Sequence, residues 1–408
     1  MIIFIALLII ISQHASSNLS IKKVNKNMNI TNNQLSETKI KILMKIGHIP
    51  SLSVCFIKNQ SLVFYKGYGS LKSYKRVEPT KDIIYQVGSV TKTITSIAIM
   101  QLWEKDLFEL DEDINNHLNF SVRNPKYPDV PITFRMLLAH QASFSPTDIS
   151  FFDLRDEIML HFLGLKIFDK NINYPYPWIK EFIVPGGKLY TDKVWEDYQP
   201  GEKANYSNID FILLEHLLER ISNQSYEEYC KGNIFEPFNM YNTSFSFHKH
   251  NKDQLAPPCY FTLFGVNLRF PHYDFGATGV GGLITSVEDL SHILIAHMNR
   301  GVYNGVRILN ESTIKLMHTK QYPNNFDENS KCYHGLGWWI YPKEWHTMKF
   351  EGHPGMILGG GALLWMNQSK DLGIIYFINL GPLNKISAWA LEKITDELYE
   401  LYLESLEK

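Results

Sequence analysis

Two groups of strand-like segments lie near opposite ends of this chain of 408 residues. Near the beginning, Ser51–Lys58 and Ser61–Tyr68 are rich in β-branched and aromatic residues and flank a short turn, which predicts a β-hairpin. Further strand-like runs near the other end are Leu336–Tyr341, Ala362–Met366 and Gly373–Leu380. Any fold for this chain must therefore accommodate strands that are separated by most of its length.

The remaining segments have mostly helical patterns. Residues 34–47 and 384–405 carry apolar residues at helical spacing, and so does Asn208–Ile221. We expect a short helix after Thr133 as well. Residues 141–200 contain many aromatic residues and prolines without a clean period, which predicts long loops and short helices beside a pocket.

Two polar tetrads before apolar runs have the pattern of a capping box, Ser225-Tyr-Glu-Glu228 and Thr285-Ser-Val-Glu288. They predict the beginnings of two further helices, the second ending near Gly301.

This order of elements predicts an α+β fold. Its simplest packing is one antiparallel sheet from both chain ends, flanked by the terminal helices, with an inserted mainly helical domain. We expect this domain over residues 34–405, with its sheet part at about 34–88 and 336–405 and its helical part at about 107–335. A binding site would then lie between the two parts.

The stretch Tyr85–Met100 is the strongest candidate for chemistry. Gly88 permits a turn, and Ser89 opens a strongly apolar helix in which Val90 and Ile94 are among the inward positions. Ser89 and Lys92 are three residues apart, so one helical turn places hydroxyl and amine on the same face. An amine beside a serine can activate it as a nucleophile. Ser-x-x-Lys occurs six times in this chain, and only this copy has such a context.

Tyr206 and Asn208 precede the helix predicted from Asn208. Tyr206 could serve as a phenolate base or proton relay, and Asn208 could donate a hydrogen bond to a substrate carbonyl. The alternative is a core tyrosine followed by an asparagine that caps the helix.

A glycine-rich stretch, Phe350–Gly361, precedes a predicted strand and contains the chain's only His-x-Gly, at His353 to Gly355. Glycines there would let a substrate approach the backbone closely. The alternative is a tight turn with an exposed histidine.

Taken in this order, Ser-x-x-Lys, Tyr-x-Asn and His-x-Gly resemble the serine β-lactamase and penicillin-binding-protein superfamily. The chain is most similar to the class C β-lactamase-related branch, which includes esterases, D-aminopeptidases and the eukaryotic serine β-lactamase-like proteins. The resemblance covers nearly all of residues 34–405. It extends to further landmarks, which are Ile132–His140, Gln199–Asn208, Ile234–Met240 and Gly281–Leu290.

The resemblance implies a role for each candidate. Ser89 would be the acylated nucleophile, Lys92 would accept its proton, and Tyr206 would return a proton to the leaving group, although Lys92 and Tyr206 both remain candidates for the base. Asn208 would hold the acyl side chain of the substrate beside His353 and Gly355. The oxyanion hole would consist of the backbone N–H groups of Ser89 and Met356.

The chain also departs from the superfamily. Gln141-Ala-Ser143 stands where members usually carry Thr-Ser-Gly, and His353 replaces the lysine of Lys-Thr-Gly. These differences favour an esterase or peptidase over a true β-lactamase. We expect a serine hydrolase for an ester, amide or peptide bond, without cofactor or metal. The alternative is a catalytically inactive glycosylated binding protein, or a self-assembling scaffold, of the same fold.

The first residues predict export. Residues 2–11 are all apolar, which suits the core of a signal peptide and is too short to span a bilayer. We expect a signal peptide at 1–17, a loose leader at 18–33 and a secreted protein; the alternative is membrane anchoring by an uncleaved segment. The Asn-x-Ser/Thr motif occurs nine times, where roughly three or four are expected by chance, and Asn59 at the hairpin turn is the foremost glycosylation candidate.

Charge and cysteine content restrict the function further. The net charge of −2 gives no basic footprint for nucleic acid. Four cysteines, Cys55, Cys230, Cys259 and Cys332, permit more than one disulfide pairing, and the strand pattern around Cys55 favours a buried free thiol. The partner we expect is a small-molecule or peptide substrate, and the sequence leaves the oligomeric state open.

Overall fold

The computed structural model describes residues 32–73, 75–146, 178–261, 267–342, 344 and 349–406. These residues form two compact units, one from Ile49–Asn384 and one from the two chain ends, Met1–His48 and Lys385–Lys408. The predicted signal peptide and nearly all of the predicted leader lie outside the described residues, as does the 147–177 part of the predicted loop region.

The unit of the chain ends is a pair of helices. α3 (Asn32–Ile46) and α13 (Lys385–Leu406) contact each other, and Lys39 donates a 2.9 Å hydrogen bond to Glu397. Ile40 and Ile394 are fully buried. Both helices were predicted from apolar spacing, and their bounds agree within two residues.

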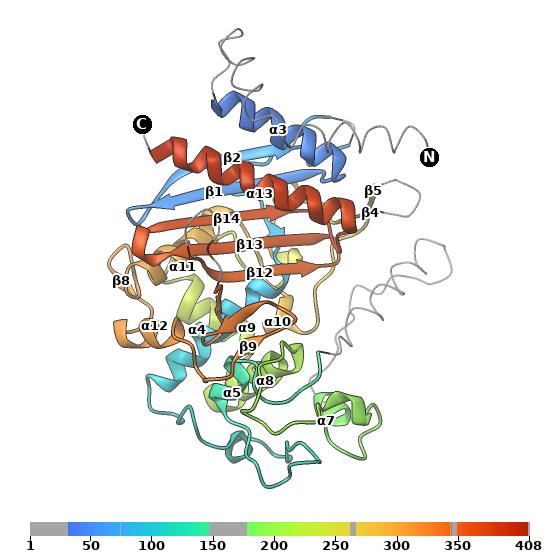
Figure 1. The fold of residues 1–408 in the computed structure, drawn as a ribbon, viewed down its shortest axis with the longest axis vertical. Helices are drawn as coiled ribbons and strands as arrows, with labels where there is room; N and C mark the ends of the chain where they lie inside the picture. The colour runs from blue at the N-terminus through green and yellow to red at the C-terminus, as the bar shows by residue number, and fades with distance from the viewer. Residues whose placement is uncertain are drawn as a thin grey trace. The chain divides into compact units, whose positions relative to one another are not determined.

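The other unit contains an eight-stranded antiparallel sheet with the order β2-β1-β14-β13-β12-β11-β10-β9. Its strands are β1 (Ser51–Lys58), β2 (Ser61–Gly69), β9 (Phe326–Asp327), β10 (Cys332–His334), β11 (Trp339–Ile340), β12 (Glu351–Ile357), β13 (Gly360–Asn367) and β14 (Leu372–Ile378). β1 pairs with β14, so strands from both ends of the chain lie side by side (Figure 1). The predicted α+β fold with one antiparallel sheet is confirmed.

Two strands differ from prediction. Glu351–Ile357 is a strand, although its glycines and proline suggested a turn. It forms because β13 pairs with it along its whole length, from Glu351 to Ile357. β11 contains only Trp339 and Ile340, because the backbone N–H groups of Leu336 and Gly337 bond to carbonyls of Met317 and Leu138 instead of a strand.

Between β2 and β9 most of the regular elements in the described residues are helices. The α-helices are α4 (Thr91–Trp103), α5 (Phe134–Leu138), α7 (Trp178–Ile183), α8 (Asn208–Ser222), α9 (Tyr226–Cys230), α10 (Thr278–Gly281), α11 (Val287–Met298) and α12 (Glu311–Met317). The short strand pairs are β3 (Tyr85–Gln86) with β6 (Ile284–Thr285), β4 (Cys259–Phe261) with β5 (Asn267–Arg269), and β7 (Val302–Tyr303) with β8 (Val306–Arg307).

The helix ends follow their capping residues. Thr133 caps α5 and Ser225 forms the predicted capping box of α9. The second predicted box is wrong by one residue, because the hydroxyl of Ser286, not Thr285, accepts the N–H of Asp289 at the start of α11. α11 ends at Met298, three residues before the predicted end.

α4 lies at the centre of the core. Residues 91–100 of α4 are all buried, and Ile94 and Ile97 have no exposed surface. α8 and α10 contact α4 (Figure 1). A helix buried on every side holds the residues at its beginning in fixed positions.

The four cysteines are free and buried, as predicted for Cys55. Burial raises the pKa of the Cys259 thiol to about 11. In the described part of the chain, no helix is both long and apolar enough to cross a membrane.

Candidate active site

Ser89 lies in a single 3₁₀ turn, η1 (Gly88–Val90), which leads directly into α4. Gly88 has a φ of +54°, and a Cβ at this position would lie 2.8 Å from the carbonyl carbon of Met356. The predicted break at Gly88 therefore has two causes, a left-handed backbone and the close approach of β12. The structure leaves Ser89 partly exposed and buries its neighbours.

Lys92 has no exposed surface, and its amine contacts several oxygen atoms. Lys92 Nζ lies 3.1 Å from Ser89 Oγ, 2.9 Å from Asn208 Oδ1 and 3.0 Å from the Val280 carbonyl oxygen. The carbonyl oxygens of Asn208 and Val280 can only accept hydrogen bonds, so Lys92 donates to both. A further position on the same nitrogen faces the serine hydroxyl.

Tyr206 and Asn208 both lie beside Lys92. The ring centre of Tyr206 is 5.0 Å from Lys92 Nζ, and Asn208 is the first residue of α8. The hydroxyl of Ser207 caps this helix by accepting the N–H of Ile209. Asn208 is therefore not the helix cap, and its side-chain oxygen accepts a hydrogen bond from Lys92.

His353, Gly355 and Met356 lie on β12, which runs against the Ser89 turn. A Cβ at Gly355 would overlap the Val87 carbonyl oxygen, and one at Gly88 would lie 2.9 Å from the Met356 nitrogen. The two glycines thus permit β12 and η1 to approach. All seven predicted site residues come from three segments that the fold brings together.

His353 is buried, which contradicts the alternative of an exposed histidine in a turn. Its ring lies 6.0 Å from that of Tyr206 and 5.1 Å from that of Trp339. His353 Nδ1 is 2.6 Å from the Pro354 carbonyl oxygen, which can only accept, so Nδ1 carries the hydrogen. Burial, and then the neighbouring Lys92, lower the pKa of His353 well below its ordinary value. The imidazole is therefore neutral at pH 7.

Two histidine–aspartate pairs beneath Tyr206 were not among the predicted site residues. In the first, His140 Nδ1 lies 2.7 Å from Asp210 Oδ2, and the His140 ring is 4.5 Å from the Tyr206 ring. Burial raises the pKa of Asp210 and lowers the pKa of His140. Burial thus favours the uncharged form of both partners, a neutral carboxyl group beside a neutral imidazole.

The second pair supports the Tyr206 backbone. Asp327 Oδ2 accepts the N–H of Tyr206 at 3.1 Å and lies 3.3 Å from His334 Nε2. Burial alone would raise the pKa of Asp327, but hydrogen bonds from His334 and Ser330 lower it to about 2. His140 belongs to a family landmark in the sequence, whereas the short strand β9 gave no signal for Asp327.

The altered loop after His140 contains a residue in the left-handed region. Ser143, at the position of their glycine, has a φ of +61°, a conformation that disfavours side chains. The Ser143 hydroxyl accepts a 3.0 Å hydrogen bond from Asn124, which offsets part of that cost.

The match to known families agrees with this geometry. The family model described as Beta-lactamase matches residues 37–396, which is most of the chain. The chain belongs to the Beta-lactamase family.

A curated relative resembles the chain over most of this chain's length. Protein flp of Staphylococcus aureus (strain MRSA252) is 25% identical over 349 residues, which are 85% of this chain and 63% of that protein. The chain thus spans less than two thirds of the length of this relative.

Solved structures share the fold. The octameric penicillin-binding protein homologue from Pyrococcus abyssi superposes with a TM-score of 0.70 at 26% identity, covering 88% of this chain and 77% of that one. The D-amino acid amidase from Ochrobactrum anthropi SV3 has a TM-score of 0.69 at 16% identity, covering 91% and 99%.

The described residues also bear on metal binding. They contain no group of three or more histidine, cysteine, aspartate or glutamate side chains arranged to hold a metal ion.

Proposed function

We propose that the chain is a serine hydrolase that forms an acyl-enzyme through Ser89. The observation that carries this proposal is the buried amine of Lys92, 3.1 Å from a partly exposed serine hydroxyl. Family membership supports the same chemistry. The bond that is cleaved is an ester, amide or peptide bond, and an esterase or peptidase fits better than a true β-lactamase.

The hydrogen bonds of Lys92 suit a general base. Val280 and Asn208 take two N–H bonds of the amine, and these can stay in place in both protonation states. In the neutral amine, a lone pair can then accept the proton of Ser89 as its Oγ attacks a carbonyl carbon. Burial removes the water that would solvate an ammonium ion, which favours the neutral state.

The later steps involve Tyr206 and β12. The tetrahedral intermediate places its oxyanion between the N–H groups of Ser89 and Met356, which the close contact of η1 and β12 brings near each other. Tyr206 delivers a proton to the leaving group, and the remaining ester of Ser89 is hydrolysed by water. In this proposal, the proton that Lys92 takes from Ser89 passes to the Tyr206 hydroxyl; Lys92 Nζ lies 5.0 Å from the centre of the Tyr206 ring.

His353 sets the polarity of the substrate in this proposal. A neutral imidazole with a hydrogen on Nδ1 offers only a lone pair at Nε2. It cannot provide the fixed positive charge that a lysine would offer to a substrate carboxylate. Neutral esters and amides are therefore the preferred substrate class.

A fluorophosphonate probe tests the nucleophile directly, because it forms a covalent bond with activated serines. We expect labelling of the wild-type protein at Ser89, no labelling of Ser89→Ala, and labelling at least about 10²-fold slower in Lys92→Ala. Ser96→Ala is the matched control, because Ser96 lies in α4 one helical turn beyond Lys92, and its hydroxyl donates to the Lys92 carbonyl.

Equal labelling of wild type and Ser89→Ala would refute the proposal. A folded wild-type protein that takes up no probe would instead support the alternative, a catalytically inactive binding or self-assembling protein of this fold.

The proposed location is the secretory pathway or the outside of the cell. It rests on the apolar segment 2–11 and on the glycosylation motifs, of which Asn59 is exposed at the β1–β2 turn. The alternative is anchoring to a membrane by an uncleaved N-terminal segment. Secretion experiments would distinguish this anchored form from a released protein.

A further inference from the structure

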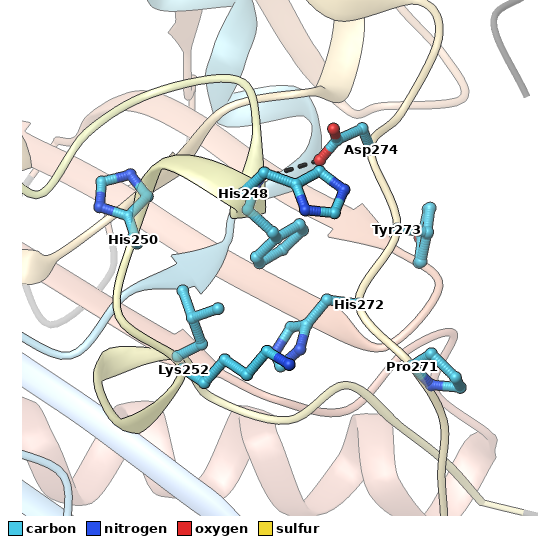
Figure 2. A pocket seen from close by; sticks show the side chains of 9 residues that line it. His248, His250, Lys252, Pro271, His272, Tyr273 and Asp274 are labelled. Atoms are coloured by element: carbon cyan, nitrogen blue, oxygen red, sulfur yellow. Dashed lines mark hydrogen bonds between the residues drawn. The ribbon is translucent and has the colours of Figure 1, made fainter. Parts of the chain in front are cut away.

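A cavity lies outside the Ser89 site. Its volume is about 330 Å³, and its walls come from residues 247–255 and 271–274, none of which belongs to the site described above (Figure 2). Small-molecule sites have volumes of about 300–1,000 Å³, so this one suits a small ligand. Its wall segments include the helical turns η5 (Phe247–Lys249) and η6 (Lys252–Gln254).

Two opposite charges line this cavity without pairing with each other. Lys252 and Asp274 both face it, and in the view of Figure 2 they stand at its opposite sides. Among the described residues, neither takes part in an ion pair within 4.0 Å. Asp274 accepts hydrogen bonds from the Ser246 hydroxyl at 2.8 Å and the Phe247 N–H at 3.0 Å, and both donors are uncharged.

The neighbouring charges differ in this respect. Asp253, adjacent to Lys252, pairs with Lys72 at 3.2 Å, and Lys249 pairs with Glu227. The uncompensated cation and anion are therefore the two that face the cavity. Charges that are held apart in this way favour a ligand that carries both signs.

The wall between these charges is made of rings. Phe247 and His272 lie with ring centres 4.7 Å apart, and Tyr273 is buried with its hydroxyl donating to the Leu358 carbonyl at 2.7 Å. Burial lowers the pKa of His272, the hydrogen bond to the Ala256 carbonyl opposes this, and the nearby Lys252 lowers the pKa as well. This imidazole is neutral at pH 7, so His272 adds ring surface to the wall and no charge.

We propose that this cavity binds a free α-amino acid with an apolar side chain. The carboxylate of the ligand pairs with Lys252, its ammonium group pairs with Asp274, and its side chain packs against Phe247, His272 and Tyr273. The site is independent of the proposed hydrolase activity, since none of its residues touches Ser89 or Lys92.

Titration calorimetry on the full chain carrying Ser89→Ala tests the proposal, because this variant cannot turn over a ligand. The probes are L- and D-phenylalanine, phenylacetate, which lacks the ammonium group, and phenethylamine, which lacks the carboxylate. We expect one enantiomer of phenylalanine to bind at one site, and each half-charged probe to bind at least about tenfold more weakly.

Variants then assign the two charges. Lys252→Gln should weaken the binding of phenylalanine about tenfold and leave the binding of phenethylamine unchanged. Asp274→Asn should weaken the binding of phenylalanine to a similar extent and leave the binding of phenylacetate unchanged. Asp253→Asn is the matched control and should bind like the parent. Lys252 is exposed, so Lys252→Gln will fold. This variant therefore still tests the proposal if Asp274→Asn disturbs η5.

Absence of phenylalanine binding would overturn the proposal. Phenylalanine binding that is unchanged in Lys252→Gln would overturn it too. The same holds if a fluorophosphonate adduct on Ser89 of the wild-type chain abolishes phenylalanine binding, because the ligand would then lie in the catalytic site.

Discussion

At the scale of single residues, His353 separates this chain from relatives with a lysine in the same motif. A histidine on a protein surface has a pKa near 6.5 and gains charge in mild acid. His353 lies beside Tyr206 and Trp339, and its pKa is lowered by burial and by Lys92. A motif alone could not distinguish these two behaviours.

The expected consequence is a preference for neutral substrates that is insensitive to mild acid. At pH 7.5, simple esters should have a higher kcat/KM than benzylpenicillin-like substrates, and His353→Lys should narrow the gap. Because the lowered pKa keeps His353 neutral, acidification from pH 8.5 to 5.5 should not shift the ratio toward the carboxylate. His353→Gln is the control without charge.

The measurement is kcat/KM for both substrate types in all three proteins across that range. Faster turnover of the carboxylate substrate by wild type, or a ratio that moves toward it below pH 6.5, would mean that His353 does not determine the preference.

Asp327 is a positioning residue that acts through the Tyr206 backbone. Asp327→Asn removes the negative charge that Tyr206, Ser330 and His334 donate to. We expect probe labelling of Ser89 or ester turnover to fall by about tenfold to a hundredfold, because Tyr206 shifts. We also expect a loss of about 1–3 kcal/mol of stability.

The pH dependence of that stability has a defined sign. The folded pKa of about 2 lies below the value near 3.9 of a free aspartate, so the stabilisation is complete above the free value and is lost as pH falls toward 2. Glu328→Gln, at an exposed neighbour paired with Lys331, is the control. An Asp327→Asn variant with lower stability and unaltered turnover would show a purely structural role.

At the scale of elements, the decisive contact is that of β12 with the turn before α4. Each element brings a glycine to it, Gly355 from β12 and Gly88 from η1, and a side-chain carbon on either would collide with backbone of the other element. A side chain can relieve such a collision by changing its rotamer, but the backbone of a strand or a helical turn cannot. The distance between Ser89 and the Met356 N–H thus depends on these two positions.

Gly355→Ala tests this dependence. We expect a loss of about 1–3 kcal/mol in stability and slower labelling of Ser89, because the two elements must separate. Gly232→Ala is the matched control, since a Cβ at Gly232 has no neighbouring atom within 4 Å and its φ is not positive. Thermal unfolding and labelling kinetics measure both effects. Equal behaviour of the two variants would disprove the role of this contact.

At the scale of the whole molecule, the described glycosylation motifs differ in their exposure. Asn59 is exposed at the β1–β2 turn with a φ of +50°. Asn367 is buried at the end of β13, and its amide donates a 2.7 Å hydrogen bond to the Lys349 carbonyl. The same sequence motif is therefore accessible in one case and engaged in the fold in the other.

Expression in a eukaryotic secretion host should give a product whose mass falls on glycosidase treatment. Ser61→Ala should remove one increment of that mass, because it destroys the motif at Asn59. Ser369→Ala destroys the motif at Asn367 in the same way and should leave the mass unchanged. Unmodified protein confined to the cytosol would rule out the proposed secretory location.

Much of the architecture follows from local patterns in the sequence. Runs rich in β-branched and aromatic residues across a turn predicted β1 and β2 closely, and apolar spacing predicted α3, α8 and α13 within about two residues. The pairing of Ser89 with Lys92 was also local, because three residues of helix place both on one face. The order of motifs then indicated the family that the match to residues 37–396 established.

What the sequence could not determine depends on contacts between distant segments. β12 is a strand only because β13 pairs with it, and His353 is neutral only because Tyr206, Trp339 and Lys92 surround it. The roles of Asp327 and of the Lys252–Asp274 cavity have the same origin. Periodicity reports which face of an element is apolar, whereas burial, pKa and the position of a charge depend on partners that only the tertiary structure brings together.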